Sequence, residues 1–128
     1  MNQALRQRAS FFRRVLRGTC PQCGKGGLFE RRARLRRQCD VCGLVYRREQ
    51  GSMIGSMYLS AIASELFAAV VAVALFFGTD WSAALALPVG IALVLAFAAW
   101  FLPYSMSLWV AVEYATDVGN GEWWAKPR

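Results

Sequence analysis

The sequence predicts a membrane α-helical hairpin of two transmembrane helices that carries a small N-terminal head. Three observations lead to this fold class: two long apolar runs joined by a short linker, a strongly basic first part, and four cysteines in two matched pairs. The 128 residues are 56% hydrophobic with a mean hydropathy of +0.31, yet the net charge is +7. These averages conceal a difference in charge between the first 50 residues and the rest of the chain. Residues 1–50 contain thirteen basic and three acidic side chains, whereas residues 51–128 contain two and five.

The first segment, residues 1–18, is predicted to form a short basic amphipathic helix. Apolar side chains recur in it at helical spacing, and arginines occupy the rest of the helical wheel. Gly18 is expected to end the helix. A basic amphipathic helix of this kind typically lies at a membrane surface. The apolar positions are Leu5, Ala9, Phe12 and Leu16, and the arginines are Arg6, Arg13, Arg14 and Arg17.

Residues 19–48 contain all four cysteines. The pairs read CPQC and CDVC, each is followed by a glycine, and the overall spacing is C-x2-C-x15-C-x2-C. Two cysteines three positions apart can bind one tetrahedral ion from a tight turn, and the following glycine permits a positive φ there. This spacing is typical of a zinc ribbon. The sequence therefore predicts a zinc-ribbon-like head whose metal ligands are Cys20, Cys23, Cys39 and Cys42.

We expect the metal to be zinc in a structural role. Four thiolates complete a tetrahedral coordination sphere and leave no position for water or substrate. A rubredoxin-like iron site and a thiol redox pair are the alternatives, because ligand type alone does not exclude iron. Disulfides would require an oxidising compartment. About thirty residues cannot build a sufficient core, so the metal should supply most of the stability of the head. A small apolar clamp is expected from Leu28, Phe29, Leu44, Val45 and Tyr46.

An arginine-rich stretch separates the two cysteine pairs. We expect it to contact anionic membrane lipid, because each basic residue near such a surface contributes about 1 kcal/mol. A plain solvated loop, an acidic protein partner and nucleic acid are the alternatives. The head lacks the interleaved aromatic residues that bind single strands, which disfavours nucleic acid. The predicted lipid-contact residues are Arg31, Arg32, Arg34, Arg36 and Arg37.

Two apolar runs are long enough to cross a bilayer. As helices, residues 53–77 extend about 37 Å and residues 82–102 about 31 Å, and a hydrocarbon core is about 30 Å thick. The linker between them has four residues, so the two helices must be antiparallel. Two buried helices of a soluble protein are the alternative, but a chain of this length cannot cover two helices that are apolar all round.

The charge distribution predicts the orientation of the hairpin. Basic residues crowd the segment before the first span, and the linker at residues 78–81 has none. The positive-inside rule therefore places both termini in the cytoplasm and makes the first span an uncleaved anchor. We expect a multi-pass protein of the bacterial cytoplasmic (inner) membrane. Trp81 suits the outer interface, and Trp100, Tyr104 and Trp109 suit the inner one.

Small residues recur at every fourth position of the first span, which permits close approach of another helix. The partner could be the second span with its Gly90, Ala92, Ala96 and Ala98, a second copy, or a larger protein. The stripe runs from Ser52 through Ala68 to Ala72. The residues predicted to pack are Gly51, Gly55, Ser56, Ser60 and Ser64.

The first span also contains one carboxyl group, Glu65. A charge at mid-membrane costs at least about 2.5–3.5 kcal/mol, so we expect this group to be protonated or paired and to face protein. A functional role and a plain hydrogen bond to a serine or a backbone carbonyl are both open. The spans contain no basic residue that could pair with it.

Residues 51–118 are predicted to comprise the hairpin and a C-terminal amphipathic extension. After Pro103, residues 104–117 either prolong the second span or lie in the membrane interface. Glu113 and Asp117 mark where this helix meets water. Residues 119–128 are expected to form a flexible tail whose Trp123 and Trp124 touch headgroups.

These motifs together resemble a known family. The segments CPQCGKGGLF and CDVCGLVY, then Glu49, Gly51, Gly55 and Tyr58 before a hydrophobic hairpin, are similar to the small bacterial membrane proteins of domain-of-unknown-function family 983. The resemblance covers roughly residues 17–115. It implies a cytoplasmic zinc-ribbon-like head on two transmembrane helices, without an established activity. Genes of some members lie beside those of haem–copper oxidase subunits, which implies respiratory-complex biogenesis. Many members have an acidic, proline-containing segment after the second cysteine pair, where this chain has RREQ.

The pattern favours a non-enzymatic adaptor or assembly factor. The chain has no histidine, which excludes Ser-His-Asp and Cys-His catalysis and every histidine-ligated metal site. It also offers no evident base, nucleophile or open metal site. The alternatives are a metal- or redox-handling protein that uses the four cysteines, and a small oligomeric transporter that uses Glu65. The expected partners are membrane lipids and, through the helices, a protein partner or a second copy.

Overall fold

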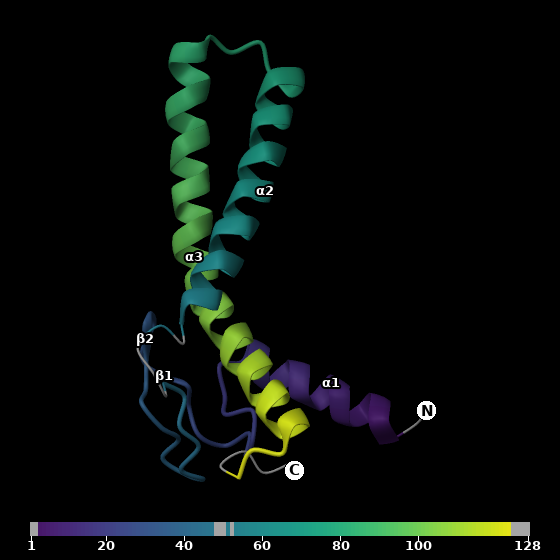
Figure 1. Ribbon diagram of the computed structural model, residues 1–128. Helices are drawn as coiled ribbons and strands as arrows, with labels where there is room; N and C mark the ends of the chain where they lie inside the picture. Colours follow the sequence, from purple (N-terminus) through teal and green to yellow (C-terminus); the bar gives the residue numbers. More distant parts are fainter. Residues whose placement is uncertain (1–2, 48–50, 52, 124–128) are drawn as a thin grey trace.

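The computed structural model describes residues 3–47, 51 and 53–123 of the chain. The elements are α1 (Gln3–Leu16), β1 (Phe29–Arg31), β2 (Arg34–Leu35), α2 (Ile54–Gly78) and α3 (Ala83–Asn120). Helices α2 and α3 form a long hairpin, and α1, the short strands and the cysteine loops gather at its open end (Figure 1). The fold is the predicted helical hairpin with a small zinc-ribbon-like head. Glu49, Ser52 and Trp124, for which the sequence predicts roles, lie outside the described residues.

Both hairpin helices are long and apolar enough to cross a membrane. Their most apolar windows have mean hydropathies of 2.2 and 2.4, and 0% of each window is buried inside the protein. A core helix of a soluble protein would be mostly buried, and a signal sequence would lie near the N-terminus, so neither explains these helices. Large apolar side chains instead project outward around α2, among them Met57, Ile62, Leu66, Val70 and Phe77. The chain is therefore a membrane protein.

Helices α2 and α3 pack through aromatic rings and glycines. The rings of Phe67 and Phe97 stack across the two helices with centroids 4.2 Å apart. Nearer the head, the indole of Trp109 lies directly against the backbone of Gly55, where a Cβ atom would overlap the ring. The indole N–H of Trp109 donates a 2.9 Å hydrogen bond to Oε1 of Glu113. Trp109 and Glu113, expected at the interface with water, thus also join the hairpin contact.

Only part of the small-residue stripe is buried against α3. Ser56 is buried, and Ser60, Ser64 and Ala68 are half-buried, but Ala72 is exposed. Ala72 lines a groove between α2 and α3 together with Ala68 and Gly90, so it faces α3 without close contact. Ser56 uses its hydroxyl locally, as a donor to the carbonyl oxygen of Met53 at 2.7 Å.

Three other residues that the sequence offered for packing, Gly51, Ala92 and Ala96, are exposed. Gly51 is exposed before the first turn of α2 with a φ of +100°. In α3, Gly90 packs against the side chain of Leu75, whereas Ala92 and Ala96 are exposed. The close approach predicted from sequence therefore rests on Gly55 and Gly90, which accept large side chains of the opposite helix.

Glu65 is exposed on α2, and no polar group of the described chain pairs with it. The expectation that it faces protein is not met within a single copy of the chain. The physical reason is its position on the helix: the face of α2 that packs on α3 contains Ser64, Phe67 and Ala68, and Glu65 lies beside that face.

Replacing Gly55 with alanine should loosen the hairpin. The new methyl group would overlap the indole of Trp109, whose N–H is bonded to Glu113, so either this ring or the helix must shift. Overpacking of this kind costs about 1–3 kcal/mol, and the higher helix propensity of alanine offsets about 1 kcal/mol of it. We expect a lower midpoint of unfolding in mixed detergent micelles.

Gly78→Ala is the matched control for this prediction. Gly78 is also in α2, and a Cβ atom there meets nothing within 4 Å. Its unfolding midpoint should equal or exceed that of the wild type. Equal midpoints for Gly55→Ala and Gly78→Ala would contradict the packing described here.

Helix α3 resolves the alternative left open by the sequence, because it is one helix of 38 residues that contains both Pro88 and Pro103. Its second half leaves the line of the hairpin and runs along the head (Figure 1). A proline in a helix removes one backbone hydrogen bond and permits a bend, which Pro103 supplies at the end of the apolar run. Residues 104–117 thus continue the second span and pack on the head.

Candidate metal centre

The four cysteines lie in two loops of matching backbone geometry. In the first, the N–H of Gly24 donates to the carbonyl oxygen of Cys20 at 2.9 Å. In the second, the N–H of Gly43 donates to the carbonyl oxygen of Cys39 at 3.0 Å. Both glycines have positive φ, +68° and +75°, as the sequence predicts. Each loop is therefore a tight turn that holds two cysteine side chains on the same side.

Short strand pairings bring the two loops together. Isolated antiparallel bridges, Thr19 with Gly27 and Gln38 with Val45, close the base of each loop. The hairpin of β1 and β2 then folds the chain back between them, with Phe29 opposite Leu35. The long spacing between the cysteine pairs is thus taken up by one small hairpin.

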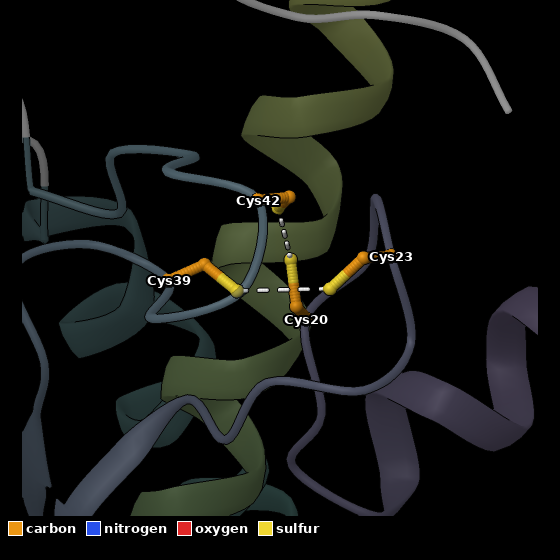
Figure 2. Close-up of side chains that lie close together, drawn as sticks. All are labelled: Cys20, Cys23, Cys39 and Cys42. Atoms are coloured by element: carbon orange, nitrogen blue, oxygen red, sulfur yellow. Dashed lines mark hydrogen bonds between the residues drawn. The ribbon is translucent and has the colours of Figure 1, made fainter.

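The sulfur atoms form one compact cluster. All four lie within 4.8 Å of one another, and the close pairs are Cys20 with Cys42 and Cys23 with Cys39, each 3.6 Å apart. Both close pairs join one loop to the other, as the dashed lines in Figure 2 show. A covalent disulfide has sulfur atoms about 2.05 Å apart, and all four cysteines are free.

The cluster fits a tetrahedral metal ion. With metal–sulfur bonds of about 2.3 Å, the sulfur atoms of a tetrahedron are about 3.8 Å apart, close to the distances found. Cys20 and Cys39 are buried, and Cys23 and Cys42 are half-buried, so the head would cover the ion on one side and leave the other side partly accessible. The four residues predicted as ligands are thus together in space and can bind one metal ion.

The surroundings favour the thiolate, the form that binds metal, at two of the four cysteines. Burial raises the pKa of Cys39, but the Tyr46 hydroxyl and backbone N–H groups of its own loop outweigh burial and bring that pKa down to about 6. The pKa of Cys23 is also lowered, because the N–H of Gly26 and a neighbouring N–H outweigh burial. Burial and the adjacent thiols raise the pKa of Cys42 to about 12, and burial also raises the pKa of Cys20. These two members of the cluster thus favour the protonated form until a cation arrives.

Gly26 makes room for the cluster. A Cβ atom on this residue would overlap Sγ of Cys39. The carbonyl oxygen of Gly26 also accepts a 2.7 Å hydrogen bond from the N–H of Cys20. Gly26 is therefore required because a side chain would not fit beside Cys39. Gly24 and Gly43 are required for a different reason, the positive φ of their turns.

Tyr46 lies beside the cluster and is almost fully buried, with a relative exposure of 1%. Its hydroxyl has no conventional hydrogen-bond partner in the described chain, and it interacts electrostatically with the thiols of Cys20 and Cys39. Burial and these two thiols raise the pKa of Tyr46, so it stays protonated. A neutral O–H beside thiolates is suited to stabilising their negative charge.

Removing this hydroxyl should weaken metal binding. In Tyr46→Phe the buried ring is kept, but the thiolates of Cys20 and Cys39 lose a nearby O–H. Loss of a group that supports metal ligands typically lowers metal affinity about 10- to 100-fold. Competition with a chromophoric chelator measures the change. Tyr58→Phe, on the exposed side of α2, should leave affinity unchanged, and equal affinities for all three proteins would contradict this role of Tyr46.

The head core includes residues from α3. One buried cluster joins Leu28, Leu44 and Tyr46 of the head to Val110 and Tyr114 of α3. Helix α1 joins the same contact through the ring of Phe11, which stacks on Tyr114 with centroids 6.4 Å apart.

The apolar clamp predicted from sequence is correct for Leu28, Leu44 and Tyr46, and Phe29 is half-buried. Val45 is 41% exposed, because it alternates with its buried neighbours in an extended segment.

Sequence reasoning missed the α3 residues that complete this core. Ser107, Val110, Ala111 and Tyr114 are buried, and their spacing of i, i+3, i+4 and i+7 is the pattern of one helix face. That pattern is visible in the sequence and indicates a buried stripe. It does not say which surface the stripe contacts.

The predicted lipid-contact arginines differ in their surroundings. Nε of Arg34 lies 3.3 Å from a carboxylate oxygen of Glu30, and Arg36 pairs with Asp40. Arg36 also donates to the carbonyl oxygen of Phe29. Of the five predicted lipid-contact arginines, Arg31, Arg32 and Arg37 are exposed and have no carboxylate partner among the described residues.

Comparison with known proteins identifies a family and no individual relative. The family described as "Protein of unknown function (DUF983)" matches residues 29–114, about two thirds of the chain. The match includes Cys39 and Cys42, both hairpin helices and the α3 residues that contact the head. It begins after Cys20 and Cys23, which join the site through the geometry described above.

No curated protein and no solved structure matches the chain. The matched segment contains the apolar hairpin and the CDVCGLVY motif, two features of the resemblance, whereas the CPQCGKGGLF motif lies before it except for Phe29. The chain belongs to the DUF983 family.

Proposed function

We propose that this protein is a non-enzymatic adaptor or assembly factor of the bacterial cytoplasmic membrane, with a structural zinc ion in a cytoplasmic head. One observation carries the proposal: the four-cysteine cluster is built directly against the extension of a membrane-spanning helix. A metal at that place would hold the head in a fixed position relative to the bilayer. Catalysis is not part of the proposal, because four thiolates fill a tetrahedral coordination sphere.

Zinc is the metal we propose. A closed tetrahedron of four thiolates is among the commonest structural zinc sites, and zinc has no redox chemistry that would require access to the ion. Iron is the competing occupant of such a ligand set. Elemental analysis of the protein purified from its own membranes distinguishes the two metals.

The cytoplasmic orientation rests on charge. The thirteen basic residues before the first span and their absence from the hairpin linker favour a head inside the cell. Reporter fusions test it. Alkaline phosphatase should be active when inserted in the linker at Thr79 and inactive when fused after Gly121, and the reverse pattern would overturn the orientation.

An adaptor function is supported by the continuity of α3. The same helix crosses the membrane and contributes Val110 and Tyr114 to the head core. A client bound to the head would therefore be held at a constant distance from the membrane surface. The family resemblance implies a client in respiratory-complex biogenesis. Haem–copper oxidase subunits are therefore the first clients to test.

Co-purification from native membranes in mild detergent tests the adaptor function. The comparison is between wild type, Cys39→Ser/Cys42→Ser and the control Val41→Ser, whose side chain is exposed within the same loop. All three must be equally abundant. We expect a stoichiometric client with wild type and Val41→Ser that is lost with the cysteine variant, in parallel with metal. A client retained by the cysteine variant, or no client with any of the three, would overturn the adaptor proposal.

One observation favours a second function, metal or electron exchange. Cys23 and Cys42 are only half-buried, so one side of the cluster is accessible. Exchange requires a labile site. Release of the metal within seconds on addition of a chelator would favour this second function, and release over hours would favour the structural one.

A further inference from the structure

A cleft of about 310 Å³ lies where the head meets the hairpin. One wall is the end of α1 with the start of the β hairpin, and the other wall is α3 immediately after its apolar run. The cleft is separate from the cysteine cluster. Its polar lining residues are Arg17, Arg32, Tyr104 and Ser107, and its apolar walls include Phe29 and Pro103.

Local structure positions Arg17 beside α3. The buried hydroxyl of Ser107 donates a hydrogen bond to the carbonyl oxygen of Val15, which ties the end of α1 to α3. Gly18 then turns the chain with a φ of +65° and packs against the ring of Phe29. The chain therefore leaves α1 at the mouth of the cleft, with Arg17 on its lining.

Arg32 reaches the cleft from the opposite side. It is in the turn between β1 and β2, and the N–H of Leu28 donates to the carbonyl oxygen of Gly18 at 2.9 Å, which holds this hairpin against the end of α1. Within the described chain, neither Arg17 nor Arg32 pairs with a carboxylate. Two arginines without a carboxylate partner in the described chain thus line one small concave surface.

The cleft lies at the level of the lipid headgroups. From Ala83, where α3 begins, to Tyr104 the helix rises about 32 Å, close to the thickness of a hydrocarbon core. Tyr104 therefore falls at the inner boundary, where tyrosine and tryptophan are enriched. Its ring contacts that of Trp100 with centroids 5.0 Å apart.

We propose that this cleft binds the phosphodiester headgroup of an anionic membrane phospholipid, with Arg17 and Arg32 as the phosphate ligands and Tyr104 at the edge of the acyl region. The proposal does not depend on the adaptor function. It assigns the lipid contact to one cleft that includes Arg17, and not to the arginine-rich stretch as a whole.

The chemistry of the cleft favours a phosphate. A guanidinium presents paired N–H groups whose fork matches phosphate oxygens, and two such groups can share one phosphate. Three carbonyl oxygens at the end of α1, those of Arg13, Arg14 and Val15, each accept a hydrogen bond and are therefore not free to repel an anion. The apolar walls suit the glycerol and the first methylene groups of a lipid.

The test uses the full-length, metal-loaded protein in phosphatidylcholine nanodiscs. Spin-labelled phosphatidylglycerol and spin-labelled phosphatidylcholine report, by electron paramagnetic resonance, which lipid is immobilised on the protein. We expect a preference for phosphatidylglycerol in the wild type. In Arg17→Gln/Arg32→Gln the preference should fall about fivefold for each guanidinium removed.

The matched control is Arg31→Gln/Arg37→Gln, which removes the same charge from exposed arginines outside the cleft lining. It should keep most of the preference, and unchanged metal content shows that both variants are folded. Equal losses in the two double variants would mean diffuse attraction and would overturn the proposal, as would a wild type without preference. Displacement of the labelled lipid by excess inorganic phosphate would assign the cleft to free phosphate and overturn the lipid as its occupant.

Discussion

The variant Cys20→Ser/Cys23→Ser should lose its metal and the structure of its head, while the hairpin keeps its helices. The four sulfur atoms join the two loops, and the close pairs run from one loop to the other. Structural zinc contributes about 10–16 kcal/mol to the folding of small zinc domains at neutral pH. The remaining core of the head, centred on Leu28, Leu44 and Tyr46, is too small to replace that contribution.

Hydrogen exchange measured by mass spectrometry separates the two parts of the molecule. In the cysteine variant, amides of residues 19–47 should exchange freely, and so should the end of α3 around Tyr114, which loses its contact with the head. Amides in the middle of α2 should stay protected. Lys25→Ser, an exposed change within the same loop, is the control and should match wild type. A protected head in the cysteine variant would show that the metal does not stabilise the fold.

Gly26→Ala should impair the metal site without removing a ligand. The added methyl group would overlap Sγ of Cys39, so either this sulfur or the first loop must move. Neither can move freely, because Gly26 accepts a hydrogen bond from Cys20 and Cys39 belongs to the cluster. A displaced ligand lowers metal affinity, and we expect a loss of about 10- to 100-fold, as when the support of a ligand is removed.

The adjacent glycine gives an unusually close control. A Cβ atom on Gly27 would have one neighbour within 4 Å, the carbonyl oxygen of Phe29 at 3.9 Å, which is an ordinary contact. Gly27→Ala should therefore bind metal as the wild type does. Chelator competition compares the three proteins. Equal affinities of Gly26→Ala and Gly27→Ala would show that the cluster does not need the space that Gly26 leaves.

The metal ligands and both spans could be predicted from sequence because each depends on local chemistry. A pair of cysteines three apart before a glycine specifies a metal-binding turn, whatever surrounds it. The Cys20 and Cys39 loops show this, since each forms the same hydrogen bond to its following glycine. Length and apolarity likewise specify a span, because the bilayer imposes one thickness on every helix that crosses it.

The packing partners could not be predicted in the same way. The stripe of small residues on α2 indicated close helix contact, yet the contact that forms is Gly55 against Trp109. Trp109 had a satisfactory local explanation as an interfacial anchor. A sequence pattern shows which side of a helix is suited to contact, but not which distant side chain fills the space.

What the sequence by itself determined is the fold class, the four sulfur ligands and the membrane character of the chain, because these follow from spacing, composition and length. What only the tertiary structure decided is how the parts are joined. It made α3 one continuous helix, placed Val110 and Tyr114 in the head core, and brought Arg17 and Arg32 to one cleft. Some of these contacts join residues about ninety or more positions apart, such as Ser107 with Val15 and Tyr114 with Phe11. Their free energy depends on shape complementarity between surfaces that no local pattern records.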